Sequence, residues 1–266
     1  MTKTAESKDQ FFTAFNFSTD SYTVPERFTL LQKQKPHPLC LLAAEQLQTY
    51  LSKQEEWVHN FGLSPAGEGI IIGKMFGVLV VKNPQNEIGY LAAFSGKLAG
   101  GNHHTGFVPP VFDALTKKSF LNRGMAELSH ITREIKKKEE LQEEGYKVQV
   151  DRLKSVRRKH SVSLQNELFN KYIFLNQSGK EKSLIELFKN ASYKNPPAGA
   201  GECAAPKLLQ YAFQQKMKPL AIAEFWWGQS PKSDFWKHGN FYPSCKEKCE
   251  PILAHMLGGL DCGILI

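Results

Sequence analysis

The sequence predicts an α/β fold: a sheet with packed helices that carries a long inserted helical hairpin. Three observations predict it. Two apolar runs separated by a turn give the strongest β-hairpin signal, a proline-free stretch with alternating charges over a helical pattern follows, and a helix–strand–helix order comes last. With 266 residues, 41% of them hydrophobic, the chain is long enough to bury a sizeable core.

The first part of the chain leads up to this sheet. Residues 1–38 are expected to form an extended arm, because prolines interrupt any regular pattern in 24–38. Residues 39–54 repeat apolar side chains at three- and four-residue spacing, which predicts a helix with one buried stripe. The hairpin follows in 75–81 and 88–94, with the turn in KNPQNE. Both runs are apolar at nearly every position, as expected of central strands that are covered on both faces.

The middle of the chain is expected to be an inserted, charged, coiled-coil-like hairpin over residues 116–189. Apolar residues recur there at helical spacing, and no proline occurs from 111 to 195. Gly145 divides the pattern and predicts two long helices. Residues 39–115 and 190–260 would then form one discontinuous α/β domain.

The charge of the chain favours a polyanionic partner. The formal net charge is +8 and the isoelectric point about 9.1. Between Arg133 and Lys159 there are ten Lys or Arg and six Asp or Glu, a net charge of +4. These charges either solvate the faces of long helices or contact RNA phosphates, and dimerisation through the hairpin is a further alternative. The candidate RNA-binding residues are Arg152, Lys154, Arg157, Arg158 and Lys159.

The cysteines and the N-terminal residues indicate a reducing compartment. Five cysteines are an odd number, and the polar first fifteen residues lack the apolar core of a secretory signal. No apolar run approaches the roughly eighteen residues that a membrane helix needs. We therefore expect a soluble cytoplasmic protein without a membrane partner.

Three cysteines in the last third of the chain are candidate metal ligands. Cys245 and Cys249 are four residues apart and would share one face of a helix, and Cys203, at the start of the preceding helix, could be the third ligand. Three protein ligands and an open fourth position are the pattern of a catalytic zinc site. The alternative is that these are small buried thiols under a packed helix, with no cofactor.

The order of elements around these cysteines is similar to that of zinc-dependent nucleic-acid deaminases. There a helix begins with one ligand and a glutamate, a strand follows, and a second helix begins with two cysteines. Two features depart from that pattern. Three residues separate the cysteines in CKEKC, where deaminases have two, and Ala205 stands two residues after Cys203, where deaminases have their glutamate. Glu202 precedes the cysteine instead.

Glu202 belongs to a glycine-rich GAGE loop that precedes a helix. Such a loop exposes backbone N–H groups to an anion, but the carboxylate would repel a phosphate, and the lysine of a P-loop is missing. A capping role at the helix N-terminus is expected for Glu202, which also stays a low-ranked candidate for catalysis.

Three further residues are candidates for acid–base chemistry. His103 and His104 lie in a glycine-rich loop, where the alternative is that they hold the loop by hydrogen bonds. Glu224 lies within an apolar strand and would need a cationic partner if buried. Trp226 and Trp227 follow it, and tryptophans in such a position either pack in the core or stack on bases.

Longer strings of the sequence carry a family resemblance. They are HPLCLLAAEQLQTYL, GKMFGVLVV, GYLAAFSGKLAGGNHHTGFVPPVFD, PPAGAGECAAPKLLQYAF, KPLAIAEFWWGQSPKSDFWKHGNFYPSC and KCEPILAHMLGGL. Taken in this order they span about residues 22–260. They resemble the long N-terminal region of a subgroup of bacterial RluA-type RNA pseudouridine synthases.

The resemblance implies an accessory module in RNA modification, with ribosomal or transfer RNA as the partner. In those proteins a separate domain isomerises uridine without metal or cofactor, using the aspartate of an RLD-type motif. This chain has no such motif, since DRLKS at Asp151 places the aspartate before the arginine. The resemblance therefore implies RNA binding or substrate positioning, in a truncated synthase or a free-standing copy. A zinc-dependent, deaminase-like enzyme is the alternative.

Overall fold

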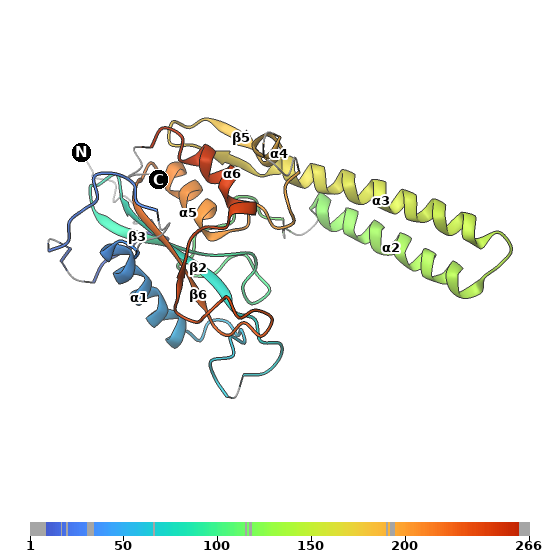
Figure 1. Cartoon of the computed structure of the whole chain (residues 1–266), viewed down its shortest axis with the longest axis horizontal. Helices are drawn as coiled ribbons and strands as arrows, with labels where there is room; N and C mark the ends of the chain where they lie inside the picture. The colour runs from blue at the N-terminus through green and yellow to red at the C-terminus, as the bar shows by residue number, and fades with distance from the viewer. Residues whose placement is uncertain are drawn as a thin grey trace, which may run out of the picture.

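The computed structural model has a mixed α/β fold, with helices on both sides of an antiparallel sheet (Figure 1). Within the described residues, no helix combines the length and the apolar character that crossing a bilayer requires. The structure describes residues 9–260 except 17, 20, 31–34, 66, 115, 117–118, 190 and 192–194.

A five-stranded antiparallel sheet lies at the centre of the fold, in the order β1-β3-β2-β6-β7. Its strands are β1 (Thr13–Ala14), β2 (Lys74–Lys82), β3 (Ile88–Phe94), β6 (Lys218–Trp227) and β7 (Phe241–Tyr242). The predicted β-hairpin is confirmed, because residues 76–82 of β2 pair antiparallel with the whole of β3. Asn83 closes the turn by accepting the Glu87 N–H at 2.8 Å, and Asn86 takes a left-handed conformation there, with φ of 67°.

Both faces of the sheet are buried under helices. On one face, α1 (Pro38–Lys53) covers residues such as Phe76, and on the other α5 (Ala204–Gln214) and α6 (Lys246–Met256) cover residues such as Leu79 (Figure 1). This explains why the central strands are apolar at almost every position, since alternate side chains enter different cores. The predicted helix after the N-terminal arm is α1, and its stripe of leucines and alanines is buried as expected.

Two long helices extend away from the sheet side by side (Figure 1). These are α2 (Phe120–Leu141) and α3 (Tyr146–Lys171). As predicted, Gly145 separates them; its φ of 76° is one that glycine adopts without strain. Near the base of the pair, Gly124 lets the helices approach closely, because a Cβ at this position would lie 2.6 Å from the Leu164 side chain.

The two long helices of the segment 116–189 end at Lys171. A two-stranded ribbon of β4 (Ile173–Leu175) and β5 (Glu181–Ser183) follows, and then the short helix α4 (Leu184–Phe188). Ser183 and Glu186 form a capping box that starts α4. Strands of three residues leave almost no periodicity, which is why the sequence pattern did not separate them from the helices.

Parts of the expected N-terminal arm lie against the sheet, with turns and bends between them, and its last residue, Pro38, already belongs to α1. β1 pairs with β3, and Thr29 forms a parallel bridge with Ala221. Asp9 accepts a hydrogen bond from the Tyr211 hydroxyl of α5 at 2.9 Å. Residues 1–8 and 31–34 of the expected arm lie outside the described residues.

Replacing Gly77 of β2 tests the close contact between the sheet and α5. A Cβ at this position would lie 2.9 Å from the Ala204 Cβ and 3.1 Å from Leu208 Cδ1. We expect Gly77→Ala to lower the free energy of unfolding by about 1–3 kcal/mol, because overpacking forces the helix away from the sheet. Urea denaturation measures this change. Gly101→Ala is the control, since its nearest neighbour would be 3.6 Å away; equal stability of the two variants would refute the contact.

Candidate metal centre

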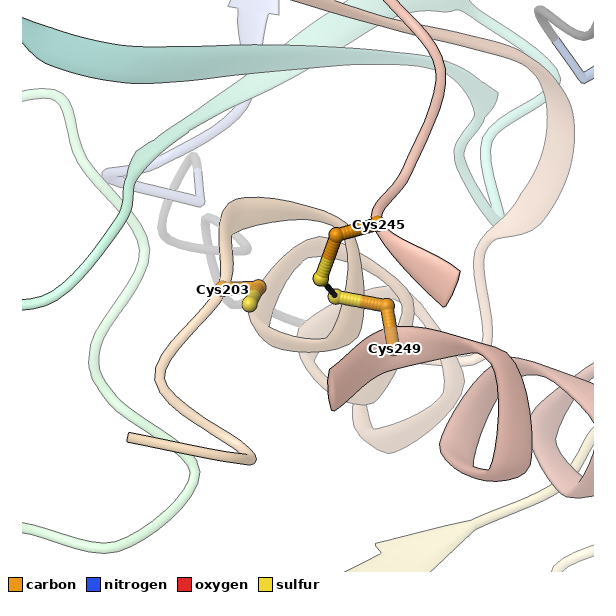
Figure 2. Close-up of side chains that lie close together, drawn as sticks. All are labelled: Cys203, Cys245 and Cys249. Atoms are coloured by element: carbon orange, nitrogen blue, oxygen red, sulfur yellow. Dashed lines mark hydrogen bonds between the residues drawn. The ribbon is translucent and has the colours of Figure 1, made fainter. Parts of the chain in front are cut away.

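Three cysteine side chains meet where α5 and α6 begin (Figure 2). Cys203 is the N-cap residue of α5, Cys245 is the N-cap residue of α6, and Cys249 lies one turn into α6. Their Sγ atoms all lie within 4.8 Å of one another, and those of Cys245 and Cys249 are 3.4 Å apart. The structure thus brings together the three cysteines that the sequence singled out.

The three thiols fit the geometry of a tetrahedral metal ion. With metal–sulfur bonds of about 2.3 Å, neighbouring sulfurs of a tetrahedral zinc site lie about 3.8 Å apart. The Cys245–Cys249 separation of 3.4 Å is close to this value, and no pair exceeds 4.8 Å, so side-chain rotations could seat an ion. Cys249 is buried, Cys203 is half-buried and Cys245 is exposed. The cluster therefore lies at the protein surface, within reach of solvent, and its three residues could hold a metal.

Hydrogen bonding among the thiols favours a thiolate at Cys245. Hydrogen bonds that its sulfur shares with Cys203 and Cys249, and the backbone N–H groups of Lys248 and Cys249, lower the pKa of Cys245 well below its ordinary value. The interactions among the three sulfurs raise the pKa of Cys203 and Cys249. Because metals bind thiolates, an ion would displace the remaining protons and take over the role of these hydrogen bonds.

A buried carboxylate, Glu224 of β6, lies next to this cluster. Only 6% of the residue is exposed. One carboxylate oxygen accepts the N–H of Ala205 at 3.2 Å, and the other accepts the hydroxyl of Ser244 at 2.7 Å. Burial raises the pKa of Glu224 to about 7, although both hydrogen bonds act in the opposite direction. Two neutral donors thus take the place of the cationic partner that the sequence analysis expected.

The capping role expected for Glu202 is wrong in the structure. The first N–H groups of α5 are bound by the Ser95 hydroxyl, at 3.2 Å from the Ala204 nitrogen, and by Glu224. The Glu202 carboxylate accepts a hydrogen bond from the Tyr172 hydroxyl instead. Sequence reasoning chose the nearest acid in the chain, whereas the groups that cap this helix come from distant strands and loops.

A buried lysine also belongs to this part of α5. Lys207 is 2% exposed, and its ammonium donates to the carbonyl oxygens of Phe94 at 2.9 Å and Gly96 at 3.1 Å. Burial lowers the pKa of Lys207 to about 8. Lys207 lies one helical turn from Cys203, so its positive charge would partly balance the negative charge of three thiolates if they held a divalent ion. The sequence analysis missed it, because a lysine in an amphipathic helix is usually exposed.

The two histidines of the glycine-rich loop lie elsewhere. His104 bonds the Leu98 carbonyl at 2.7 Å, and its ring contacts Phe94 and Trp57, which pack on the α1 face of the sheet. Cys203 and Cys249 lie on the opposite face, where they pack in or against the core under α5 and α6. His103 pairs with an aspartate of the same loop region, at 2.9 Å. In the structure both histidines hold this loop, which was one of the two alternatives.

The basic residues singled out in the helical segment are all exposed on α3. Two of them are tied to α2: Lys154 pairs with Glu139 at 2.8 Å, and Arg157 donates to the Thr132 hydroxyl at 2.9 Å. The remaining candidates are Arg152, Arg158 and Lys159. These side chains belong to the projecting helices and not to the metal centre.

Comparisons with protein-family models, with curated proteins and with solved structures gave no match. The function is therefore inferred from the residues of this chain. Its most distinctive features are the three cysteines with Glu224 beside them and the exposed basic face of α3.

Replacing Glu224 by glutamine tests its burial in the metal-free protein. The folded-state pKa of about 7 lies above the ordinary value of 4.5, so the folded protein binds more protons between these pH values. The stability that Glu224 contributes is therefore complete below about pH 4.5 and is lost as the pH rises through 7. A shift of this size corresponds to about 3 kcal/mol.

We expect Glu224→Gln to remove this dependence, because glutamine does not titrate. Urea unfolding at pH 5 and pH 8, with a chelator present, measures the effect. The free energy of unfolding of the wild type should fall relative to the variant between these pH values. If the free energy of unfolding changes equally in the wild type and the variant between pH 5 and pH 8, the raised pKa of Glu224 is contradicted.

Proposed function

We propose that the chain is an accessory RNA-binding module of a pseudouridine synthase, and that it holds RNA for a uridine-isomerising domain. The observation that carries this proposal is the pair α2–α3, which extends from the sheet and exposes basic side chains (Figure 1). The sequence resemblance to the N-terminal region of RluA-type synthases supports it independently. The catalytic aspartate of that family is not assigned to any residue here.

The basic residues of α3 suit contacts with a phosphate backbone. Arg152 and Lys159 are seven residues apart, so they lie on one side of the helix, about 10 Å apart along its axis. Lys154 and Arg157 face α2, where their partners are exposed or half-buried. An exposed ion pair such as Lys154–Glu139 contributes little to stability. A phosphate could therefore replace the glutamate without loss to the fold.

Removal of charge from α3 tests this function. We expect the triple variant Arg152→Gln, Arg158→Gln, Lys159→Gln to bind single-stranded RNA more weakly than the wild type. The slope of log K against log salt should fall in magnitude by about 2, because each lost phosphate contact removes about 0.7 for single strands. Fluorescence anisotropy with labelled RNA over a series of salt concentrations measures this slope.

The matched control removes three exposed lysines outside the projecting helices, in the variant Lys53→Gln, Lys97→Gln, Lys218→Gln. Its net charge equals that of the α3 variant, so a general charge effect would appear in both. Equal slopes for the two variants would refute the α3 interface. Sedimentation of the wild type without RNA tests the alternative that the helices dimerise.

The metal centre supports a second candidate function, a zinc-dependent enzyme with a deaminase-like arrangement. The observation that favours it is the position of Glu224. A deaminase has its glutamate two residues after the first ligand, where this chain has Ala205. The Glu224 carboxylate bonds the N–H of Ala205, and therefore reaches the same end of α5 from the neighbouring strand. In this candidate Glu224 would move a proton beside the three cysteines.

Zinc bound to three thiolates has a fourth position for water or substrate, and it supplies Lewis-acid chemistry there. The chain would contribute the ligands Cys203, Cys245 and Cys249, the proton-transferring Glu224, and Ser244, which orients the carboxylate through its 2.7 Å hydrogen bond. The wider spacing of the two α6 cysteines is accommodated because Cys245 is the N-cap residue of the helix and Cys249 lies one turn further on.

Elemental analysis tests the metal site. We expect one zinc ion per chain in protein that is purified under reducing conditions without chelator. Cys249→Ser should lose the ion, because its thiol is the most buried of the three. Cys40→Ala should keep it, since Cys40 lies in the other core, under α1. Absence of zinc from the wild type, with no uptake of added Zn²⁺, would rule out this candidate and leave the RNA-binding proposal unaffected.

A further inference from the structure

Four aromatic side chains form a cluster after the end of β6. Trp226 of β6 stacks on Trp236, with ring centroids 5.2 Å apart and an interplanar angle of 20°. Phe235 and Tyr242 each pack against Trp236, at 4.8 Å and 4.7 Å. Phe235 also contacts the ring of Tyr242, at 5.2 Å. Phe235 is nevertheless 65% exposed, so three rings support a fourth that faces solvent.

This aromatic cluster lies on the same sheet face as the metal centre. Side chains alternate along a strand, so Trp226 points to the same side as Glu224, which bonds the N-terminus of α5. Tyr242 is paired with Glu224 in the β6–β7 register, and paired antiparallel residues share a face. The chain continues from Tyr242 through Ser244 to Cys245. The cluster and the cysteines therefore lie on the same side of the sheet.

Hydrogen bonds hold the backbone segment that carries the exposed ring of Phe235. The Tyr242 hydroxyl donates to the Phe235 carbonyl at 2.8 Å and accepts the Lys237 N–H at 2.7 Å. The Phe235 N–H donates to the Ser233 hydroxyl at 3.2 Å. The backbone of Phe235 is thus held at both its N–H and its carbonyl, which preorganises the segment that carries the exposed ring, so less conformational entropy is lost when a ligand covers it.

We propose that Phe235 is a stacking surface for an unpaired nucleobase of RNA, supported from below by Trp236 and Tyr242; this inference rests on the proposed RNA-binding function. Base–aromatic stacking accepts any base, because every base has a π face. Lys232 and Lys237 flank Phe235 in the sequence, and both are exposed, which suits contacts with the phosphates of the same strand. Between these two lysines the sequence has one acidic residue, Asp234, so the segment keeps a net positive charge.

The size of the exposed surface favours a base over a protein partner. A stable protein interface buries about 800 Å² on each side, whereas here one ring faces solvent between charged residues. A stacked base covers an area of this size. A base on Phe235 would lie on the side of the sheet that also carries Glu224 and the three cysteines.

Binding of labelled, unstructured oligouridine to variants of Phe235 tests the proposal. We expect Phe235→Ala and Phe235→Leu to weaken binding about ten-fold, and Phe235→Tyr to bind like the wild type, because only an aromatic ring stacks. The salt dependence of binding should not change in these variants, since no phosphate contact is removed. Ile70→Ala removes an apolar side chain that is 81% exposed elsewhere and should have no effect.

These measurements distinguish base stacking on Phe235 from the RNA-binding function on which it rests. Wild-type affinity of Phe235→Ala, with weakened binding of the α3 charge variant, would overturn the stacking surface and keep the RNA-binding function. Wild-type affinity of Phe235→Leu would also overturn it, since apolar contact alone would then suffice. Failure of the wild type to bind oligouridine at low salt would overturn both. Thermal unfolding of each variant verifies that the fold is retained.

Discussion

Two-sided burial of the central strands is the constraint on which the rest of the structure depends. Residues of β2, β3 and β6 enter two cores, one under α1 and the other under α5 and α6. Both faces must be covered by helices, because bare apolar strands would expose a large hydrophobic surface. On the second face Gly77 admits the start of α5 to close contact with the sheet. The beginnings of α5 and α6 therefore come together against the sheet, with their cysteines.

Glu224 connects the elements that this packing brings together. It belongs to β6, bonds the first turn of α5 through the N–H of Ala205, and bonds the segment before α6 through Ser244. A buried carboxylate with two neutral donors and a raised pKa is costly for stability above neutral pH. Such groups are concentrated at functional sites, where burial shifts a pKa toward the range that proton transfer needs. This raised pKa and the position of Glu224 beside three thiols are the features on which the second proposed function rests.

Much of the fold could be predicted from periodicity, because the central hairpin, α1 and the division at Gly145 are local patterns. The meeting of the three cysteines also followed from local rules, since two lie one turn apart and the third starts the preceding helix. The partners of Glu224 could not be predicted, because they depend on packing between segments far apart in the sequence. The aromatic cluster depends on the register between β6 and the two-residue strand β7, which has no periodic signal.

The junction between α3 and the cysteine cluster has a mechanical consequence. The 26 residues of α3 extend for about 39 Å, at 1.5 Å per residue. The helix is followed at once by Tyr172, whose hydroxyl bonds Glu202, the residue before Cys203. The base of α3 packs against α4 and β5, and Tyr172 links its end to the residue before Cys203. A force on the far end of α3 would therefore be transmitted to these elements and, through the Tyr172–Glu202 hydrogen bond, to the loop that carries Cys203.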